Sequence, residues 1–409
     1  KSQPGTEYFV NFSVTTVEPE PLIPAGYEIA YDQFQLPIQA EKRIYKANGP
    51  ALTTATSGDE LTVSSSKVNF VFNKKSGLVT SYKVDGTEYF KDGFGIQPNF
   101  WRAPNDNDYG NGAPKRLQVW KQSSKNFHVT DVKMTTENKV VSLKATYLLA
   151  AGNLYVVTYR IYPSGIVNVS AQFTSTDMQA AETEVSEATR MATFTPGSDA
   201  ARKAASKLEV PRIGVRFRLP AQMNNVQYFG RGPEENYIDR NHGTLVGVYK
   251  TTADKMYFNY VRPQENGHHT DTRWIALSPD KGNGLAIVAD SLIGFNALRN
   301  SIEDFDSEEA LPHPYQWNNF SPEEVANHDE KAARNVLRRM HHVNDITPRD
   351  FVEVCVDMKQ QGVGGYDSWG ARPEPFHQIP ANRDYSWGFT LVPVRSASQA
   401  NEVAKYDYQ

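Results

Sequence analysis

The stretch Tyr155–Phe173, YVVTYRIYPSGIVNVSAQF, decides the fold class of this 409-residue chain. Apolar side chains stand at every second position on both sides of the turn residues Pro163, Ser164 and Gly165. A period of two is typical of strands that bury one face, and a Pro-Ser-Gly cluster between two such runs indicates a turn. The stretch therefore predicts a β-hairpin.

The same alternation recurs along the chain and predicts a β-rich protein. It runs through 141–147, 215–219 and 352–358, and the aromatic content of 11%, with 21 Tyr and 20 Phe, also favours strands. Helix signals are few; in one, Ser321 can cap a helix whose first turn holds Pro322 and Glu324. We expect an all-β fold with a large antiparallel sandwich and one short helix that begins at Ser321.

Composition excludes several classes of protein. With 39% hydrophobic residues, 22% charged residues and a formal charge of −4, the chain has no electrostatic reason to bind nucleic acid or anionic membrane. No apolar run approaches the roughly 18 residues of a membrane span. We therefore expect neither nucleic acid nor a membrane as a partner. The one cysteine, Cys355, excludes an internal disulfide, and its place in the alternating FVEVCVDM favours a structural thiol over a nucleophile.

The chain divides near residue 56. The small and polar stretch NGPALTTATSGDE separates a front strand-rich unit from a new series of strands. The front unit, 1–56, is shorter than a complete immunoglobulin-like sandwich of roughly 100 residues, so we expect it to be the end of such a domain plus a linker. The large sandwich is expected over 57–396 and a tail over 397–409. Because the chain begins Lys-Ser-Gln rather than with Met, we expect a fragment.

Four ordered motifs carry a resemblance to a known family. They are QPNFWRAPNDNDYG (97–110), YFGRGPEENYIDR (228–240), YVRPQENGHHTDTRW (260–274) and GVGGYDSWG (362–370). Together they resemble the C-terminal domain of the large β-galactosidases of glycoside hydrolase family 2, a galactose mutarotase-like supersandwich. The front segment PAGYEIAYDQFQLP resembles the end of the β-sandwich that precedes this domain. The resemblance extends from Pro24 to Pro393.

The resemblance implies a function for the whole enzyme and a limited role for this part. The enzyme would hydrolyse terminal β-D-galactosides with two glutamates held on a TIM barrel of roughly 250 residues, and this chain has no such stretch. We expect no catalytic residue in the chain and no hydrolysis by it alone. The family's magnesium and sodium sites would lie mostly in the barrel, so no cofactor is expected here. Expected partners are a β-galactoside or oligosaccharide, the upstream domains and, in the intact enzyme, further copies; the compartment would be the bacterial cytoplasm or periplasm.

The motif GVGGYDSWG is the first candidate for sugar contact. Gly362, Gly364 and Gly365 allow a tight loop, and an indole on such a loop offers a flat apolar face to a pyranose. The resemblance implies that Trp369 reaches the active site and forms a platform for the sugar on its aglycone side, with Asp367 and Ser368 beside it. From the residues alone, Trp369 could instead cap the core. Tyr366 stands where family members often have a second acidic residue, which leaves a polar role at that position in doubt.

RAPNDNDYGNG is the second candidate. Its Asn and Asp residues form turns, and the resemblance implies a nearby loop at the active-site edge, which makes Asn107, Asp108 and Gly110 expected substrate contacts. The glycine and glutamate positions of an EF-hand are not matched, so we expect no metal. Arg102 most simply pairs with one of the acids as part of the domain structure.

Two motifs suggest a vestigial sugar site. Related mutarotases use a carboxylate base and a histidine acid, and Glu265 with His268 or His269 is a conceivable pair. Adjacent strand residues point to opposite faces, so only one histidine could serve. The alternative is a hydrogen-bonded network that organises the sandwich. Two other functions thus stay open for the chain, a stand-alone carbohydrate-binding module and a vestigial aldose mutarotase. The residues in question are Arg102, Glu235, Asn236, Glu265, His268, His269 and Arg273.

Overall fold

The hairpin expected from 155–173 is present in the structure, a computed structural model that describes residues 2–38, 40–175, 209–306, 342–367 and 370–408. Strand β12 (Leu154–Ile161) pairs antiparallel with β13 (Val167–Thr174), with Tyr155 opposite Phe173. The alternating apolar residues of both strands are buried. The hairpin prediction is therefore confirmed.

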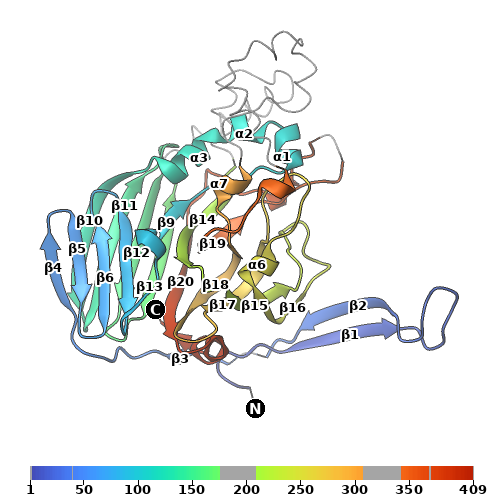
Figure 1. Ribbon diagram of the computed structural model, residues 1–409, viewed down its shortest axis with the longest axis horizontal. Helices are drawn as coiled ribbons and strands as arrows, with labels where there is room; N and C mark the ends of the chain where they lie inside the picture. The colour runs from blue at the N-terminus through green and yellow to red at the C-terminus, as the bar shows by residue number, and fades with distance from the viewer. Residues whose placement is uncertain (1, 39, 176–208, 307–341, 368–369, 409) are drawn as a thin grey trace, which may run out of the picture.

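Twelve strands form one large antiparallel sheet among the described residues (Figure 1). Its main path runs β10-β11-β12-β13-β20-β18-β17-β15-β16. Three further strands form a branch: β19 pairs with β18 of the main path, β14 pairs with β19, and β9 pairs with β14. The stretches 141–147, 215–219 and 352–358 lie in β11, β14 and β19, as predicted. The remaining bounds are β9 Gln97–Asn99, β10 His128–Glu137, β11 Val140–Leu148, β14 Arg212–Pro220, β15 Asn225–Gly232, β16 Leu245–Thr252, β17 His269–Ser278, β18 Gly284–Leu298, β19 Phe351–Gln360 and β20 Tyr385–Val394.

A second sheet of five strands covers the β10–β13 end of the first (Figure 1). Aromatic rings fill the space between them: Phe70 and Phe72 lie 5.7 and 6.0 Å from the Tyr159 ring. Two buried tyrosine hydroxyls donate to backbone carbonyls across the layers, that of Tyr82 to Gly165 O (2.6 Å) and that of Tyr147 to Gly77 O (2.6 Å). The all-β fold with a large antiparallel sandwich is thus confirmed. The five strands are β4 Thr53–Ser57, β5 Glu60–Ser64, β6 Val68–Asn73, β7 Leu78–Val84 and β8 Thr87–Glu88.

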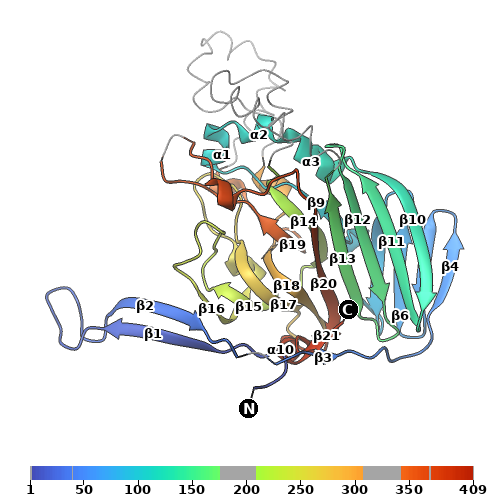
Figure 2. The same ribbon diagram turned by 180° about the vertical axis from the view of Figure 1, so that it is seen from behind.

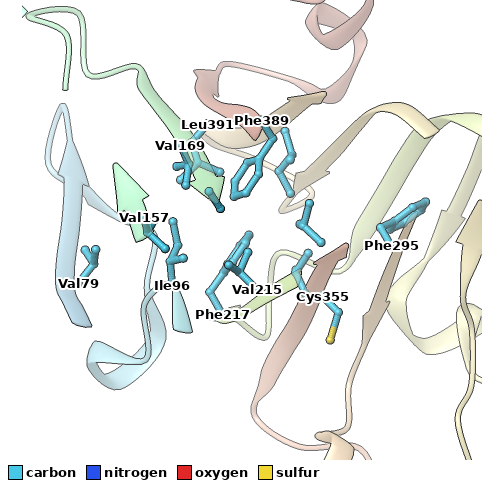
Figure 3. Close-up of a cluster of buried hydrophobic side chains, with 14 of the residues drawn as sticks. Val79, Ile96, Val157, Val169, Val215, Phe217, Phe295, Cys355, Phe389 and Leu391 are labelled. Atoms are coloured by element: carbon cyan, nitrogen blue, oxygen red, sulfur yellow. The ribbon is translucent and has the colours of Figure 1, made fainter. Parts of the chain in front are cut away.

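The core continues from this sandwich into the middle of the large sheet. Figure 3 shows Val79 and Ile96 at one end, Val215 and Phe217 of β14 in the centre, and Cys355 beside them. Cys355 is buried, and burial raises the pKa of its thiol well above the ordinary value. The prediction of a structural thiol is confirmed.

The front of the chain forms a two-stranded arm. Strand β1 (Phe9–Thr15) pairs with β2 (Glu28–Gln35), and Figures 1 and 2 show this hairpin extending away from the sheets. After it, β3 (Arg43–Ile44) pairs in parallel with β21 (Tyr406–Asp407) near the C-terminus. The C-terminal residues, which were expected to form a tail from 397 onward, thus contribute η5 (Ala397–Gln399), α10 (Ala400–Val403) and β21 to the folded body. Strand β4 of the second sheet begins at Thr53, before the expected boundary at residue 56.

Short helices close the ends of the sheets. Helices α1 (Asp106–Gly110), α2 (Ala113–Arg116) and α3 (Gln118–Lys125) lie together above the strands in Figure 1. The helix expected from Ser321 lies outside the described residues. Among those described, no helix is long and apolar enough to cross a membrane. The others are η1 Lys91–Gly93, α6 Ala253–Met256, α7 Ile302–Phe305, η3 Val343–Asp345 and η4 Pro375–His377.

Candidate functional site

The segment that follows β19 forms the centre of the candidate site, and we name residues 361–371 the glycine loop. Gly364, Gly365 and Gly370 have φ angles of +67°, +107° and +91°, a backbone region that side chains with a Cβ disfavour. Gly364 and Gly365 therefore adopt the backbone conformation that the sequence predicted for a tight loop, whereas Gly362 does not. Tyr366 is exposed, and Asp367 Oδ1 accepts a hydrogen bond from Ala371 N (3.1 Å). Ser368 and Trp369 lie outside the described residues.

Asp239 binds the start of the glycine loop. Its Oδ1 accepts a hydrogen bond from Val363 N (3.0 Å) and its Oδ2 accepts one from Gly364 N (2.8 Å). The carboxylate lies so close that a Cβ on Gly362 would be 2.4 Å from Oδ2. The second motif, which contains Asp239, is thus in direct contact with the fourth.

Arg102 binds the same loop from the carbonyl side. Its Nε and Nη2 donate to Asp108 Oδ2 (3.1 Å) and Oδ1 (2.9 Å), while Nη1 donates to Gln361 O (2.7 Å) and Nη2 to Gly362 O (3.0 Å). Both charged side chains are buried, at 2% and 4% exposure. The expected pairing of Arg102 with one of the acids is confirmed, and the pair also anchors the loop.

Helix α1 lies against the glycine loop because of its N-terminal cap. Asn105 Oδ1 accepts from Asp108 N (2.8 Å), and Asp108 Oδ2 accepts in return from Asn105 N (3.1 Å), a capping box. Asn105 Nδ2 donates to Val363 O (3.3 Å). Further along, Asn107 Nδ2 lies 3.2 Å from the Cβ position of Gly365, and backbone atoms of Gly110 lie within 3 Å of the Cβ position of Gly370. The structure therefore brings Asn107, Asp108 and Gly110 next to the loop.

The third motif reaches the other side of α1. The Arg262 guanidinium stacks 3.7 Å from the centre of the Tyr109 ring and donates to Asp106 Oδ1 (2.6 Å). Four large hydrophobic side chains in or close in sequence to this motif and the glycine loop are more than half exposed. We refer to these four residues together as the exposed edge: Phe258, Val261, Tyr366 and Phe376.

Glu235 and Asn236 join the second motif to the third. Glu235 Oε2 accepts from Gly267 N (2.8 Å), and Oε1 accepts from Arg240 Nη2 (2.9 Å) and from the Tyr260 hydroxyl. Asn236 is fully buried, and its Oδ1 accepts from Thr270 N (2.9 Å). Every contact here is to another protein group of the described chain, as in the network alternative.

Glu265 and His268 belong to a buried charge cluster around Arg212. Arg212 Nη2 donates to Glu265 Oε1 (2.7 Å), and its Nε lies 3.2 Å from Asp357 Oδ2. His268 Nδ1 lies 3.8 Å from the same oxygen, and its ring stacks on Tyr237. Burial raises the pKa of the Glu265 carboxyl and the nearby Arg212 offsets part of that rise, while burial and then Arg212 hold the pKa of His268 well below its usual range.

The two histidines face different surroundings, as the strand geometry predicts. His269 lies between two carbonyl oxygens, Gly267 O at 3.0 Å from Nδ1 and Pro233 O at 3.2 Å from Nε2. Burial lowers its pKa, although these two carbonyls oppose that effect. Since Glu265, His268 and His269 are at most 4% exposed, solvent reaches none of them in this arrangement. An acid/base role for them stays a prediction.

Arg273 does not join the other predicted residues. Its guanidinium donates to both carboxylate oxygens of Glu7 (2.8 and 2.6 Å), at the base of the β1–β2 arm. Arg273 therefore links the arm to β17.

Sequence reasoning assigned no role of its own to Asp239, and it missed Arg212 and Asp357 as members of these clusters. A signal for the last two was present, because the polar alternates of β19 include Asp357 and those of β14 include Arg212. The two strands pair, and Arg218 Nε lies 2.8 Å from Glu353 Oε2 further along the same pairing. Only the pairing of the two strands makes the charges complementary. For Asp239 the signal was its place among the polar residues of the second motif.

Comparisons with known proteins agree with the motif resemblance. The family model described as "Beta galactosidase small chain" matches residues 64–391, and the one described as "Beta-galactosidase, domain 4" matches residues 1–37. The β-galactosidase of Priestia megaterium is 33% identical over 373 residues, which are 90% of this chain and 30% of that protein. The β-galactosidase of Streptococcus thermophilus is 25% identical over 377 residues, 91% of this chain and 30% of that protein.

The chain thus spans under a third of the length of these curated relatives. Among solved structures, the galactose 1-epimerase of Lactobacillus acidophilus is similar at 9% identity with a TM-score of 0.39, covering 85% of this chain and 98% of that one. The small-chain family model matches residues 64–391, which is most of the chain, and the chain therefore belongs to the beta-galactosidase small chain family.

Proposed function

We propose that the chain is the C-terminal part of a retaining β-galactosidase of glycoside hydrolase family 2 that hydrolyses terminal β-D-galactosides. The curated relatives support this proposal, since the chain aligns over 90% of its length with β-galactosidases three times as long. A retaining glycosidase needs two carboxyl groups about 5 Å apart across the anomeric carbon. We place that pair in the upstream part of the enzyme and assign this chain a supporting role.

The single observation that carries this role is the meeting of the motifs around the glycine loop. Asp239 and Arg102 bind the loop, α1 lies against it, and Arg262 joins the third motif to α1. The residues of the exposed edge lie in or close in sequence to the loop and the third motif, and exposed apolar side chains can mark a contact surface. We propose that the upstream catalytic domain covers this edge and that the glycine loop and α1 face the aglycone side of its site.

Within that surface we propose Trp369 as the sugar platform, with Asp367, Ser368, Asn107 and Gly110 beside it. The family resemblance of the DSW motif supports the role of Trp369, and the contacts of Gly365 and Gly370 with α1 place Asn107 and Gly110 at the same loop. Asp108 is buried against Arg102, so its contribution is to hold α1 and the loop in place.

The β1–β2 arm supports the assignment of an upstream partner domain. One face of the hairpin carries Val10, Phe12, Val14 and Phe34, and all four are exposed. An exposed apolar ribbon of two strands is unstable on its own in water. We propose that further strands of the preceding domain cover this face in the intact enzyme.

Turnover of o-nitrophenyl β-D-galactoside tests the proposal at two levels. The isolated chain should give no turnover above buffer. A β-galactosidase of Priestia megaterium whose aligned 30% is replaced by this chain should be active, and Trp369→Ala in this chimera should raise KM about tenfold, equivalent to about 1.4 kcal/mol.

Two results would contradict the proposal. One is sustained turnover by the isolated chain that a substitution within it abolishes. The other is a Trp369→Ala chimera with unchanged kinetic constants and a sharply lower melting temperature, because a buried indole typically contributes about 3–5 kcal/mol to stability.

Calorimetry of the isolated chain with galactose addresses the carbohydrate-binding alternative, since binding heat at millimolar sugar would favour an independent module. Polarimetry on fresh α-galactose addresses the mutarotase alternative, which a rate equal to that of buffer excludes.

A further inference from the structure

We propose that Asp239 is a positioning residue for sugar binding: its carboxylate fixes the glycine loop in the orientation in which the loop meets substrate. This inference rests on the proposed function, in which the loop faces the sugar. Asp239 itself touches only protein groups of its own chain among the contacts described, and it acts through the loop.

The geometry is that of an anion held by consecutive backbone amides. Val363 N and Gly364 N each donate to a different oxygen of Asp239, at 3.0 and 2.8 Å. Gly364 adopts the left-handed conformation, and such backbones present successive N–H groups to one anion. The hydrogen bonds that a carboxylate accepts from two N–H groups are stronger than those of a neutral acceptor, because they are charge-assisted.

Two features hold Asp239 itself in place. It precedes Arg240 in a tight turn closed by Arg240 N donating to Tyr237 O (2.7 Å). On the other side, Gly362 lacks a Cβ, which would otherwise stand 2.4 Å from Asp239 Oδ2. The Asp239 carboxylate can therefore occupy this position only because residue 362 is a glycine.

Asp239 completes a clamp that Arg102 and Asn105 begin. These two side chains donate to the carbonyls of residues 361–363, whereas Asp239 accepts from the N–H groups of 363 and 364. The backbone is thus held from both sides at its start. Beyond it, Gly365, Tyr366 and Asp367 are exposed, so the clamp holds the more buried start of the loop.

A change at Asp239 should therefore alter the loop more than the fold. In the active chimera, Asp239→Ala should raise KM for o-nitrophenyl β-D-galactoside about tenfold with kcat within about twofold, and Asp239→Asn, which keeps one acceptor oxygen, about threefold. The matched control is Asp254→Asn on α6, which pairs with Arg299 and should leave KM unchanged. A structural role alone would not produce this graded rise in KM at a constant melting temperature.

Hydrogen exchange on the isolated chain separates the inference from the proposed function. The amides of Val363 and Gly364 should exchange at least tenfold faster in Asp239→Ala, with strand amides unchanged. Unchanged exchange at these two amides would overturn the inference, whatever the kinetics. Faster exchange with an unchanged KM would confirm that Asp239 holds the loop but overturn its role in sugar binding. A chimera that is inactive without any substitution would count against the proposed function instead. If Asp239→Ala fails to fold, Gly362→Ala, whose Cβ displaces the carboxylate, provides the same comparison.

Discussion

Asp357 is a fully buried carboxyl group whose ionisation affects the stability of the fold. It lies opposite Gly214 in the β14–β19 pairing, and a Cβ at Gly214 would be 2.1 Å from its Oδ1. Burial raises the pKa of the Asp357 carboxyl to about 7; Arg212 lowers it and Glu265 raises it. A buried carboxylate is favourable only where its partners replace the water that it loses, and within the described chain neither Asp357 oxygen has a partner in hydrogen-bond geometry.

The raised pKa predicts how Asp357 changes stability with pH. The folded chain binds this proton more tightly than the unfolded chain does, so the contribution of Asp357 is full below about pH 4 and is lost as the pH rises to about 7. His268, whose pKa is lowered, acts in the opposite direction, so the test compares variants rather than one profile. The stability of Asp357→Asn minus that of the wild type should increase by up to about 1.4 kcal/mol per pH unit from pH 4 to 7 and then stay level. Urea unfolding across this range measures the difference. A flat difference would mean that the folded carboxyl is ionised throughout.

At the scale of elements, the side-chain amide of Gln33 joins the β1–β2 arm to β16, in addition to the Glu7–Arg273 pair and the hydrogen bond from the Tyr31 hydroxyl to Gly243 O (2.6 Å). Gln33 Oε1 accepts from Val246 N (2.8 Å) and Gln33 Nε2 donates to Val246 O (2.8 Å). Strand β16 ends the main path of the large sheet, and edge strands present unpaired backbone groups. Gln33 thus satisfies a donor and an acceptor as another strand would.

Removing this amide should loosen the junction without unfolding either element. In Gln33→Ala the Val246 amide should exchange about tenfold faster, because a single hydrogen bond contributes about 1 kcal/mol. The melting temperature should change by only a few degrees. Gln35→Ala is the matched control, since its amide binds Glu7 rather than β16, and it should leave Val246 unaffected. Equal exchange at Val246 in both variants would show that the arm is held by other contacts.

At the scale of the molecule, the sequence predicted what each strand buries but not which distant segments meet. The alternating apolar residues that begin with Tyr155 and Val157 predicted the hairpin correctly, because burial of every second side chain is a local property of a strand. The clamp joins Arg102, Asp239 and Gly362, which are more than a hundred residues apart, and no local pattern determines such a meeting. All three lie in motifs identified by resemblance to the family, and that resemblance, rather than periodicity, directed attention to the correct region.

The C-terminal residues are a second long-range feature, and they tie the linker to the sandwich. Tyr45 N donates to Asp407 O (2.8 Å), the Tyr45 and Tyr408 rings lie 5.1 Å apart, and the Tyr162 hydroxyl donates to Tyr408 O (2.6 Å). Tyr408 is buried, so its loss opens a cavity between the linker and the large sheet. Tyr408→Ala should therefore lower the free energy of unfolding by about 3 kcal/mol and speed exchange of the Tyr45 amide. Tyr408→Phe keeps the ring and loses only the hydrogen bond to Val403 O, so its cost should be about 1 kcal/mol. Thermal unfolding and hydrogen exchange measure both variants, and equal stability of Tyr408→Ala and the wild type would mean that the C-terminal residues contribute nothing to the packing of the linker.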